Sequence, residues 1–188
     1  HTLSFQVPKL AFFLSENESN IGNVHLLDIG LHPGFLQKLY TNLEWTDISL
    51  VKKIVRPRNR FSHKGTFGHA LLVVGSHGKM GAAVLSVKAC LRSGVGLLTC
   101  HIPSCGYTIM QTAVPEAMVS TDVNMNVNTK MDSSLEPYKC IGIGPGIGKA
   151  PETKTLLENL LSNFKNPRVL DADALNILAE NPELIPLI

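Results

Sequence analysis

The sequence predicts an α/β protein built on a mainly parallel β-sheet, and two features of the chain support this prediction. Residues 69–75 and 97–102 are short apolar runs without the alternation of a half-exposed strand. Such runs are typical of strands that are buried on both faces. Turns that contain glycine and helical patterns follow these runs, and this rhythm is characteristic of parallel strands joined by right-handed crossovers.

The same rhythm continues towards the end of the chain. Residues 82–93 predict a helix whose charged residues, Lys88 and Arg92, share one narrow face, so we expect it to be almost wholly buried. Residues 121–136 are polar, rich in Asn and Asp, and predict no clear element. The other predicted elements are a helix over residues 106–113, strands over 140–144 and 168–170, and helices that follow Pro151 and Asp171.

The first sixty or so residues have a different pattern. Residues 1–6, 9–14 and 24–29 are short runs that favour β-strands, and three short strands are too few for an independent core. Residues 36–60 predict a linker with one short helix that begins at Thr46. We therefore divide the chain into residues 1–35, a linker over residues 36–60 and a main domain over residues 61–188.

The composition excludes several classes of protein. The chain has 188 residues and a formal net charge of +2, and 44% of its residues are hydrophobic, which is enough for a buried core. No basic strand interleaved with aromatic residues points to nucleic acid, and neither a membrane-length apolar run nor a signal peptide is visible. The four cysteines form no CxxC pair and lack metal-ligand spacing, so we expect free thiols in a cytoplasmic protein without a bound metal.

Ligands of parallel α/β sheets bind beyond the carboxyl ends of the strands, and three loops are predicted there. The first loop leads into a helix N-terminus, where Gly81 and Ala82 leave room for a phosphate beside the free N–H groups. Glycine also serves simply to turn the chain from strand to helix, so both explanations stay open. Because Lys79 is not followed by Ser or Thr, the loop is not a Walker A motif.

The second loop carries Gly144, Gly146 and Gly148 around Pro145. It can lay backbone donors against a ligand, or it can act only as a tight turn into the next helix. Its glycines fall at every second position, which does not match the dinucleotide fingerprint GxGxxG.

The third loop places two carboxylates, Asp171 and Asp173, at the end of a strand. Either can cap the following helix, or bind a hydroxyl or a Mg²⁺ ion held by phosphates. Lys64 and Gly65 are a weaker candidate for phosphate binding, and a solvated loop is the alternative there.

Several short motifs follow one another in a fixed order along the main domain. They are His63-Lys64-Gly65-Thr-Phe-Gly68, Val74-Gly-Ser76, Gly81-Ala82, Leu91-Arg-Ser-Gly-Val-Gly-Leu-Leu-Thr99, Pro115-Glu116, Gly142-Ile-Gly-Pro-Gly146 and Leu170-Asp-Ala-Asp-Ala-Leu175. No single motif is specific, but the ordered set resembles the ADP/ATP-dependent NAD(P)H-hydrate dehydratases.

The N-terminal segment carries a second resemblance. Residues 1–13, Gly22 and residues 27–31 resemble the last strands of the NAD(P)H-hydrate epimerase domain, which bifunctional repair enzymes of bacteria fuse upstream of the dehydratase. Residues 1–35 are therefore expected to end a Rossmann-like epimerase domain. The resemblance implies a K⁺ ion for that domain and catalytic residues that precede His1.

The resemblance implies a ribokinase-like three-layer fold for the main domain. It also implies the reaction, in which a nicotinamide ring hydrated at C6 returns to NADH or NADPH after ATP or ADP, with Mg²⁺, phosphorylates its hydroxyl. A homo-oligomer is expected as well. By analogy, the residues that bind the hydrated dinucleotide are Gly81, Ala82, Gly144, Gly146, Gly148, Asp171 and Asp173.

Other parts of the family pattern are missing. The family's His-Pro-Gly-Glu segment, its Lys-Gly nucleotide loop and its Gly-Asp motif, which bears the catalytic base, would all follow Ile188. The apolar tail after Glu183 also favours a truncated chain. We therefore expect no catalytic base within these residues, no activity of this piece alone, and self-association through an exposed sheet edge.

Two other functions stay open. A small-molecule kinase of the same fold, such as one that phosphorylates a vitamin precursor, would use the same loops. Pro115-Glu116 and the Gly-Pro-Gly segment favour the dehydratase over this kinase. A non-catalytic scaffold would bind no nucleotide and would self-associate tightly.

Overall fold

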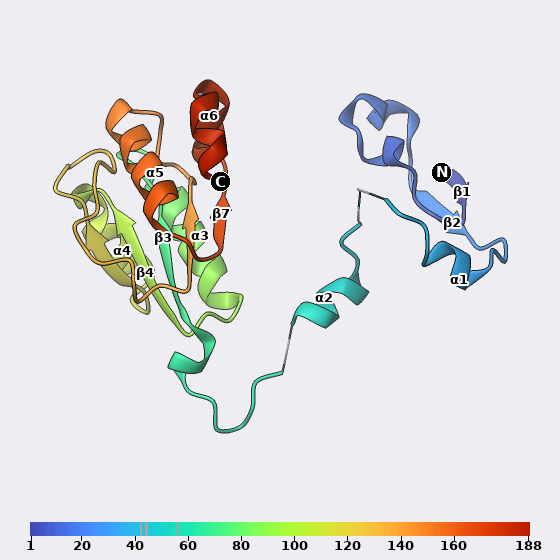
Figure 1. Cartoon of the computed structure of the whole chain (residues 1–188), viewed down its shortest axis with the longest axis horizontal. Coiled ribbons are helices and arrows are strands. Elements are labelled where there is room, and N and C mark those ends of the chain that lie inside the picture. The colour runs from blue at the N-terminus through green and yellow to red at the C-terminus, as the bar shows by residue number, and fades with distance from the viewer. Residues whose placement is uncertain (42, 44, 56) are drawn as a thin grey trace. The chain divides into compact units, whose positions relative to one another are not determined.

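A computed structural model describes residues 1–41, 43, 45–55 and 57–188 of the chain. The chain forms two units, His1–Pro57 and Arg58–Ile188, which are coloured blue to teal and green to red in Figure 1. The first unit contains the segment predicted as residues 1–35 together with most of the predicted linker. No helix among the described residues has the length and apolar character needed to cross a bilayer.

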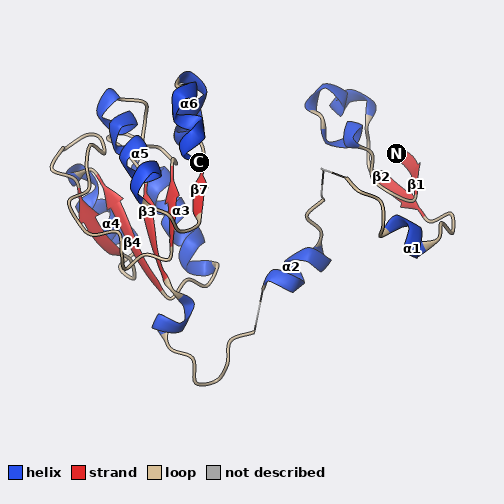
Figure 2. Ribbon diagram, in the orientation of Figure 1, coloured by secondary structure: helices blue, strands red, loops and turns tan. Residues whose placement is uncertain are grey.

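The second unit is organised around a five-stranded sheet in the order β5-β4-β3-β6-β7. All neighbouring strands are parallel, which confirms the predicted sheet (Figure 2). The strands are β3 (His69–Val73), β4 (Leu97–Ile102), β5 (Met118–Thr121), β6 (Cys140–Ile143) and β7 (Arg168–Leu170).

Helices cover both faces of this sheet, so the unit has three layers. Adjacent residues of β3 point to opposite faces, as the pleat of a strand requires. Ala70 packs with the buried side chains of α3 (Met80–Arg92) and α4 (Tyr107–Ala113). Leu71 packs with those of α5 (Pro151–Asn163) and α6 (Asp173–Glu180). The four leucines of α5 at positions 156, 157, 160 and 161 are buried in this second cluster.

Three predictions about the second unit need correction. Helix α3 is not almost wholly buried, because only Met80, Ala83 and Val87 are buried in it and Leu85 is 71% exposed. The short strand β5 lies just before the polar stretch 121–136 and ends at its first residue, in residues for which the sequence predicted no element. Residues 183–188 are not a loose tail, since most of them lie in a 3₁₀ helix, Pro182–Leu187, that buries Leu184.

The first unit contains little regular structure. Strands β1 (Thr2–Phe5) and β2 (Val24–Leu27) pair in parallel, which confirms two of the three predicted strands. The third was wrong, because Leu10–Phe13 and Ser15–Asn20 are 3₁₀ helices. Short helices follow at α1 (Pro33–Leu36) and α2 (Ile48–Ile54), and the cap of α2 is Asp47 rather than Thr46.

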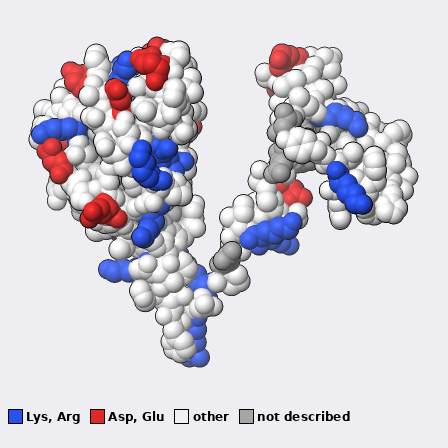
Figure 3. Space-filling view, viewed as in Figure 1, with Lys and Arg blue, Asp and Glu red and all other residues white. Residues whose placement is uncertain are grey.

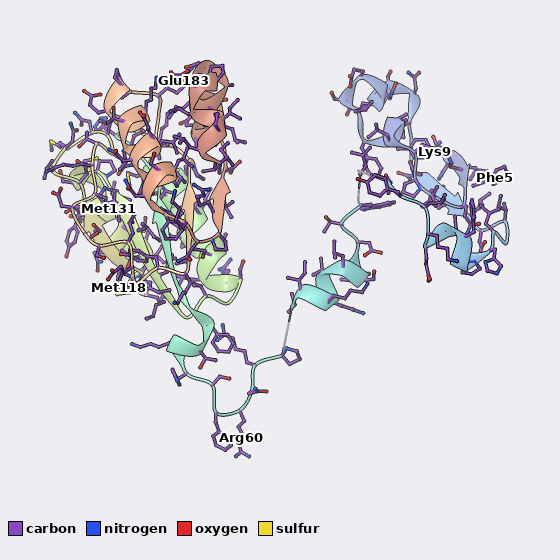
Figure 4. The ribbon with its side chains drawn as sticks, in the orientation of Figure 1. Phe5, Lys9, Arg60, Met118, Met131 and Glu183 are labelled. Atoms are coloured by element: carbon purple, nitrogen blue, oxygen red, sulfur yellow. The ribbon has the colours of Figure 1, made fainter. Side chains whose placement is uncertain are left out.

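Many apolar side chains of the first unit are exposed to solvent. Phe5, labelled in Figure 4, is 59% exposed, and Trp45 is 54% exposed although its ring meets the edge of Phe13. An apolar groove of about 840 Å³ is lined by Leu10, Phe13 and Trp45, among others. A two-stranded sheet with so little buried surface is marginally stable by itself.

Candidate functional site

Three loops of the second unit meet at one edge of the sheet. Strands β3, β6 and β7 are parallel neighbours, so the segments that follow them leave the same edge. These segments are residues 74–79, 144–150 and 171–173, the last of which ends at the first residue of α6. The first two loops are joined by hydrogen bonds. The Gly75 N–H donates to the Pro145 carbonyl at 2.9 Å, and the Ser76 hydroxyl donates to the Gly146 carbonyl at 2.7 Å.

Two of the loop glycines are required by packing. Gly144 has a φ of +137°, and a Cβ atom there would lie 1.8 Å from the Asp171 carbonyl oxygen. A Cβ on Gly146 would lie 3.0 Å from the Cβ of Ala82, and the φ of Gly146 is +71°. These glycines let the three loops approach one another closely, so their presence is explained without a ligand.

Gly81 and Gly148 are in a different situation. No atom lies within 4 Å of the position that a Cβ would take at either residue. Gly148 has a φ of +75°, which favours glycine, whereas Gly81 lies in α3 and carries no such constraint. Open space therefore lies in front of both residues, as a ligand that contacts the loops would need.

The Asp173 carboxylate ties the three loops together. Its Oδ2 accepts a hydrogen bond from the Gly148 N–H at 2.8 Å and lies 3.4 Å from the Lys79 ammonium. Its Oδ1 accepts from the Asn176 side chain at 3.3 Å. Burial, the largest influence, opposes ionisation, but these donors together hold the pKa of Asp173 below its usual value. The carboxylate is therefore charged at neutral pH.

The explanation that these aspartates cap α6 does not fit the structure. Ala172 occupies the N-cap position, and no side chain caps this helix. Ala172 has a φ of +45° and a ψ of −117°, a conformation that costs a residue with a side chain about 1–3 kcal/mol. Asp171 is exposed, and its carboxylate makes no hydrogen bond or ion pair with any residue that the structure describes. A free carboxylate at this edge suits a hydroxyl or a bound cation.

A buried aspartate holds the polar segment beside these loops. Asp122 accepts hydrogen bonds from the backbone N–H groups of Asn124 at 2.7 Å, Thr129 at 2.5 Å and Lys130 at 2.9 Å. Burial disfavours its charge most strongly, yet these donors hold the pKa of Asp122 below its usual value. Sequence reasoning missed this residue. The alternation Asp122-Val-Asn124 inside the Asn-rich stretch, typical of Asx turns, was the available signal.

The same segment supports the first loop from its other side. The buried Asn128 side chain donates to the Gly75 carbonyl at 2.8 Å, and the His77 N–H donates to the Asn126 carbonyl at 2.7 Å. The Thr153 hydroxyl of α5 donates to the Asn128 carbonyl at 2.9 Å. Between the first loop and α4 lies a recess of about 450 Å³, lined by His77, Gly78, Met80, Gly81, Cys105 and Ile109.

A buried histidine lies under this segment. The His101 ring contacts the Ser120 hydroxyl at 3.1 Å through Nδ1 and lies 3.5 Å from the Asp122 carboxylate through Nε2. Burial lowers the pKa of His101, and the attraction of Asp122 only partly opposes this effect. The ring is therefore neutral at neutral pH and belongs to the support of the site.

Lys64 and Gly65 do not join the three loops. They lie in a 3₁₀ helix, Lys64–Phe67, that directly precedes β3, whereas the loops follow the strands. A Cβ on Gly96 would lie 1.6 Å from the Lys64 carbonyl oxygen, so this helix packs closely against the start of β4. In Figure 4 the approach to this helix, marked by Arg60, lies at the opposite end of the unit from Glu183.

We predict contrasting effects of one methyl group at two glycines. Gly144→Ala forces a methyl group onto the Asp171 carbonyl oxygen and strains the backbone, so unfolding should become easier by about 3 kcal/mol or more. Gly81→Ala, the control, enters open space in a helix and should leave stability unchanged or slightly raised. Urea unfolding measures both changes, and equal stability of the two variants would contradict the packing role of Gly144.

His101 should make stability depend on pH. Its pKa is lowered in the folded state from about 6.5, so its contribution is complete above 6.5 and is lost as the pH falls through the folded pKa. In His101→Asn, which keeps an amide beside Ser120, the fall in Tm between roughly pH 7 and pH 5 should become shallower. Calorimetry across this range tests the prediction, and an unchanged slope in the variant would refute it.

The chain is similar in sequence to known proteins of one family. The sequence pattern of a family described as NAD(P)H-hydrate dehydratase matches residues 70–187. Bifunctional NAD(P)H-hydrate repair enzymes of Vibrio cholerae and Escherichia coli are 32% and 33% identical to the chain. These matches cover 97% of the chain in both cases, but 36% and 34% of the two enzymes. An ADP-dependent (S)-NAD(P)H-hydrate dehydratase of Streptococcus thermophilus is 34% identical over 71% of the chain and 48% of that enzyme.

The chain is also similar to solved structures of this family and of the same fold. The ADP/ATP-dependent NAD(P)H-hydrate dehydratase of Bacillus subtilis, co-crystallised with ATP and Mg²⁺, superposes with a TM-score of 0.60 at 28% identity. The match covers 72% of this chain and 48% of that one. A ribokinase-like protein of Enterococcus faecalis, 23% identical over 76% of this chain and 52% of its own, shares the fold with a TM-score of 0.62. The chain thus spans about a third of the bifunctional relatives and about half of the single-function ones. With its family pattern matched over residues 70–187 and its ribokinase-like neighbours, the chain belongs to the NAD(P)H-hydrate dehydratase family.

Proposed function

We propose that the whole protein dehydrates hydrated NADH or NADPH in a reaction that consumes ATP or ADP. The observation that carries this proposal is the meeting of three loops, two of them glycine-rich, in a chain of the dehydratase family. Open space lies in front of Gly81 and Gly148, and the Asp171 carboxylate of the third loop is exposed. The family pattern described as NAD(P)H-hydrate dehydratase matches residues 70–187, which hold the three loops.

We assign two kinds of role to the site residues. Gly81 and Gly148 face open space and would contact the hydrated dinucleotide. We assign the same role to Ala82 because it follows Gly81 in the chain, although it is half-buried and its methyl group lies beside Gly146. Gly144 and Gly146 act indirectly, because they let the loops pack closely enough to form one surface. The assignment of Lys64 and Gly65 to phosphate binding has no support from the arrangement within one chain.

Asp171 is the residue best placed to meet the reacting part of the ligands. Its carboxylate is exposed at the end of β7 and has no partner among the described residues. A carboxylate of this kind fits a Mg²⁺ ion carried by nucleotide phosphates, or the hydroxyl of the hydrated ring. ATP or ADP would phosphorylate that hydroxyl. Loss of inorganic phosphate from C6 and of a proton from the neighbouring ring carbon would then restore the double bond of the nicotinamide ring.

We assign no catalytic base to residues 1–188, and the role assigned to Asp171 is to bind the Mg²⁺ ion or the hydroxyl rather than to remove its proton. Asp173 is held by Gly148, Asn176 and Lys79, and His101 is buried below the loops. A base for the hydroxyl proton must lie within hydrogen-bond reach of the ligand. We therefore expect residues 1–188 alone to be inactive and the base to come from elsewhere in the whole protein.

We extend the proposal to the first unit and to assembly. The relatives that match this unit are named bifunctional, which supports residues 1–35 as the end of a second catalytic domain, the epimerase. The K⁺ ion of that domain rests on the family resemblance alone. Strand β7 is an outer strand of the sheet and Val169 on it is 66% exposed, which favours a homo-oligomer. Four free cysteines suit a reducing cytoplasm.

A small-molecule kinase of the same fold is the second candidate. It is favoured by one observation, that the three loops and a free carboxylate would serve transfer of phosphate to any alcohol equally well. The two functions are separated by product. The dehydratase regenerates NADH or NADPH and releases inorganic phosphate, whereas the kinase releases a stable phosphate ester.

Asp171→Asn should lower dehydration of hydrated NADPH by the whole protein. Loss of a charge-assisted contact to the ligand should reduce kcat/KM by roughly tenfold to a hundredfold. The matched control is Asp132→Asn, which removes an exposed carboxylate paired with Lys130 on the surface. The assay follows regeneration of NADPH absorbance with ATP or ADP present, and full activity of Asp171→Asn would remove this residue from the proposed site.

A further inference from the structure

The first loop carries a charged residue that neither the sequence motifs nor the family resemblance assigns to the site. Lys79 lies at the N-terminal end of α3, two residues before Gly81. Its ammonium lies 3.4 Å from the Asp173 carboxylate, and its own carbonyl oxygen would lie 3.1 Å from a Cβ on Gly146. Lys79 therefore contacts the second and third loops at once.

The ion pair adds little to the stability of the fold. The Lys79 side chain is 54% exposed, and pairs at such positions contribute about 1 kcal/mol or less. The first and second loops are already joined by the hydrogen bonds from Gly75 and Ser76. A role in folding alone thus does not account for Lys79.

The pair has a clear electrostatic consequence for a ligand. Asp173 is ionised and 19% exposed, and it holds the backbone N–H of Gly148, a residue that faces open space. An uncompensated carboxylate there would repel the phosphate groups of any nucleotide that contacts these loops. Lys79 is the cation that offsets this charge, and its exposed ammonium can also contact a phosphate directly.

Two neighbouring ion pairs serve as a comparison. Lys149 of the second loop pairs with Glu180 of α6. Lys154 of α5 pairs with Glu183 of the C-terminal 3₁₀ helix at 2.9 Å. Their carboxylate side chains are 55% and 61% exposed, and neither accepts a hydrogen bond from a loop N–H of any residue that the structure describes. Among these three pairs, the one at Asp173 is partly buried and shares its oxygen with the second loop. Charge of both signs is also interspersed over the face of this unit in Figure 3, so surface pairing alone is unremarkable.

We propose that Lys79 is a positioning residue that holds Asp173 against the Gly148 amide and offsets its charge, so that the site accepts a ligand bearing phosphate groups. This inference rests on the proposed function for the class of ligand, and it names Lys79 as a determinant of anion binding. The backbone also constrains the position of Asp173, because the preceding residue, Ala172, has the strained conformation with a φ of +45°.

The experiment is a double-mutant cycle on ligand binding by the whole protein. Lys79→Met, Asp173→Asn, the double variant, Lys79→Arg and the surface control Lys154→Met are titrated with NADPH, NADH, ATP and inorganic phosphate. Lys79→Met should weaken the binding of the ligand that contacts Lys79 by about tenfold, while Tm stays close to the parent. Lys79→Arg should restore binding, and Lys154→Met should bind like the parent.

The double variant carries the decisive result. Without the Asp173 charge, Lys79 has less to offset, so the double variant should bind the affected ligand better than Lys79→Met does. Added salt should shrink the defect of Lys79→Met, because it partly screens the repulsion between the Asp173 carboxylate and the ligand's phosphates. Weaker binding of NADPH alone would identify its 2′-phosphate as the group that contacts Lys79. Weaker binding of both dinucleotides would identify their pyrophosphate, and weaker binding of ATP would identify the nucleotide phosphates.

Unchanged binding of all four probes by Lys79→Met, or a double variant that binds no better than Lys79→Met, would overturn the inference. Binding is measured without turnover, so the outcome is separate from that of the proposed function. If the whole protein fails to dehydrate hydrated NADPH while Lys79→Met still weakens a phosphate ligand, the proposed function fails and the role of Lys79 stands. If dehydration occurs but Lys79→Met binds all four probes like the parent, the proposed function stands and the role of Lys79 fails.

Discussion

The close approach of two backbones at Gly144 fixes the arrangement of the site. The second loop leaves β6 directly against the turn that follows β7, with no room for a side chain between Gly144 and the Asp171 carbonyl. This contact fixes the positions of Asp171 and Asp173. It acts through backbone atoms that directly follow β6 and β7 and are therefore held by the sheet. The side chains that would contact a ligand are therefore attached to a rigid backbone.

Buried polar side chains complete this frame on the side of β4 and β5. Asp122 satisfies three backbone donors of a segment that has no regular structure, and Asn128 carries the contact on to the first loop. A segment rich in Asn and Asp can be rigid when its donors converge on one buried carboxylate, because leaving them unpaired would cost about 1–3 kcal/mol each. The first loop is thus held between Asn128 and the second loop, which leaves Gly81 facing open space.

The parts of this fold that follow from local pattern could be predicted, and the parts that depend on tertiary contacts could not. Continuous apolar runs revealed β3, β4 and β6, and glycine spacing located the loops that follow two of them. Strand β5 was missed because it is short and its residues are mostly partly buried or exposed, so its sequence lacks a core signal. The burial of α3 was overestimated because composition does not show that Leu85 points to solvent. Asp122 was missed because its donors lie in a stretch whose conformation only the fold determines, and Lys79 because its partner is far along the chain.

The two aspartates of the third loop differ in how their charges are balanced, and this difference bears on the ligands. Asp173 has a partner inside the protein, the ammonium of Lys79, whereas the Asp171 carboxylate has none among the described residues. A polyphosphate that approaches Asp171 would meet a bare negative charge, and binding would then require a cation that arrives with the ligand. Under the proposed function, a nucleotide complexed with Mg²⁺ would meet this requirement and free nucleotide would not, so the charge balance of the loop would favour the metal complex as the species that binds.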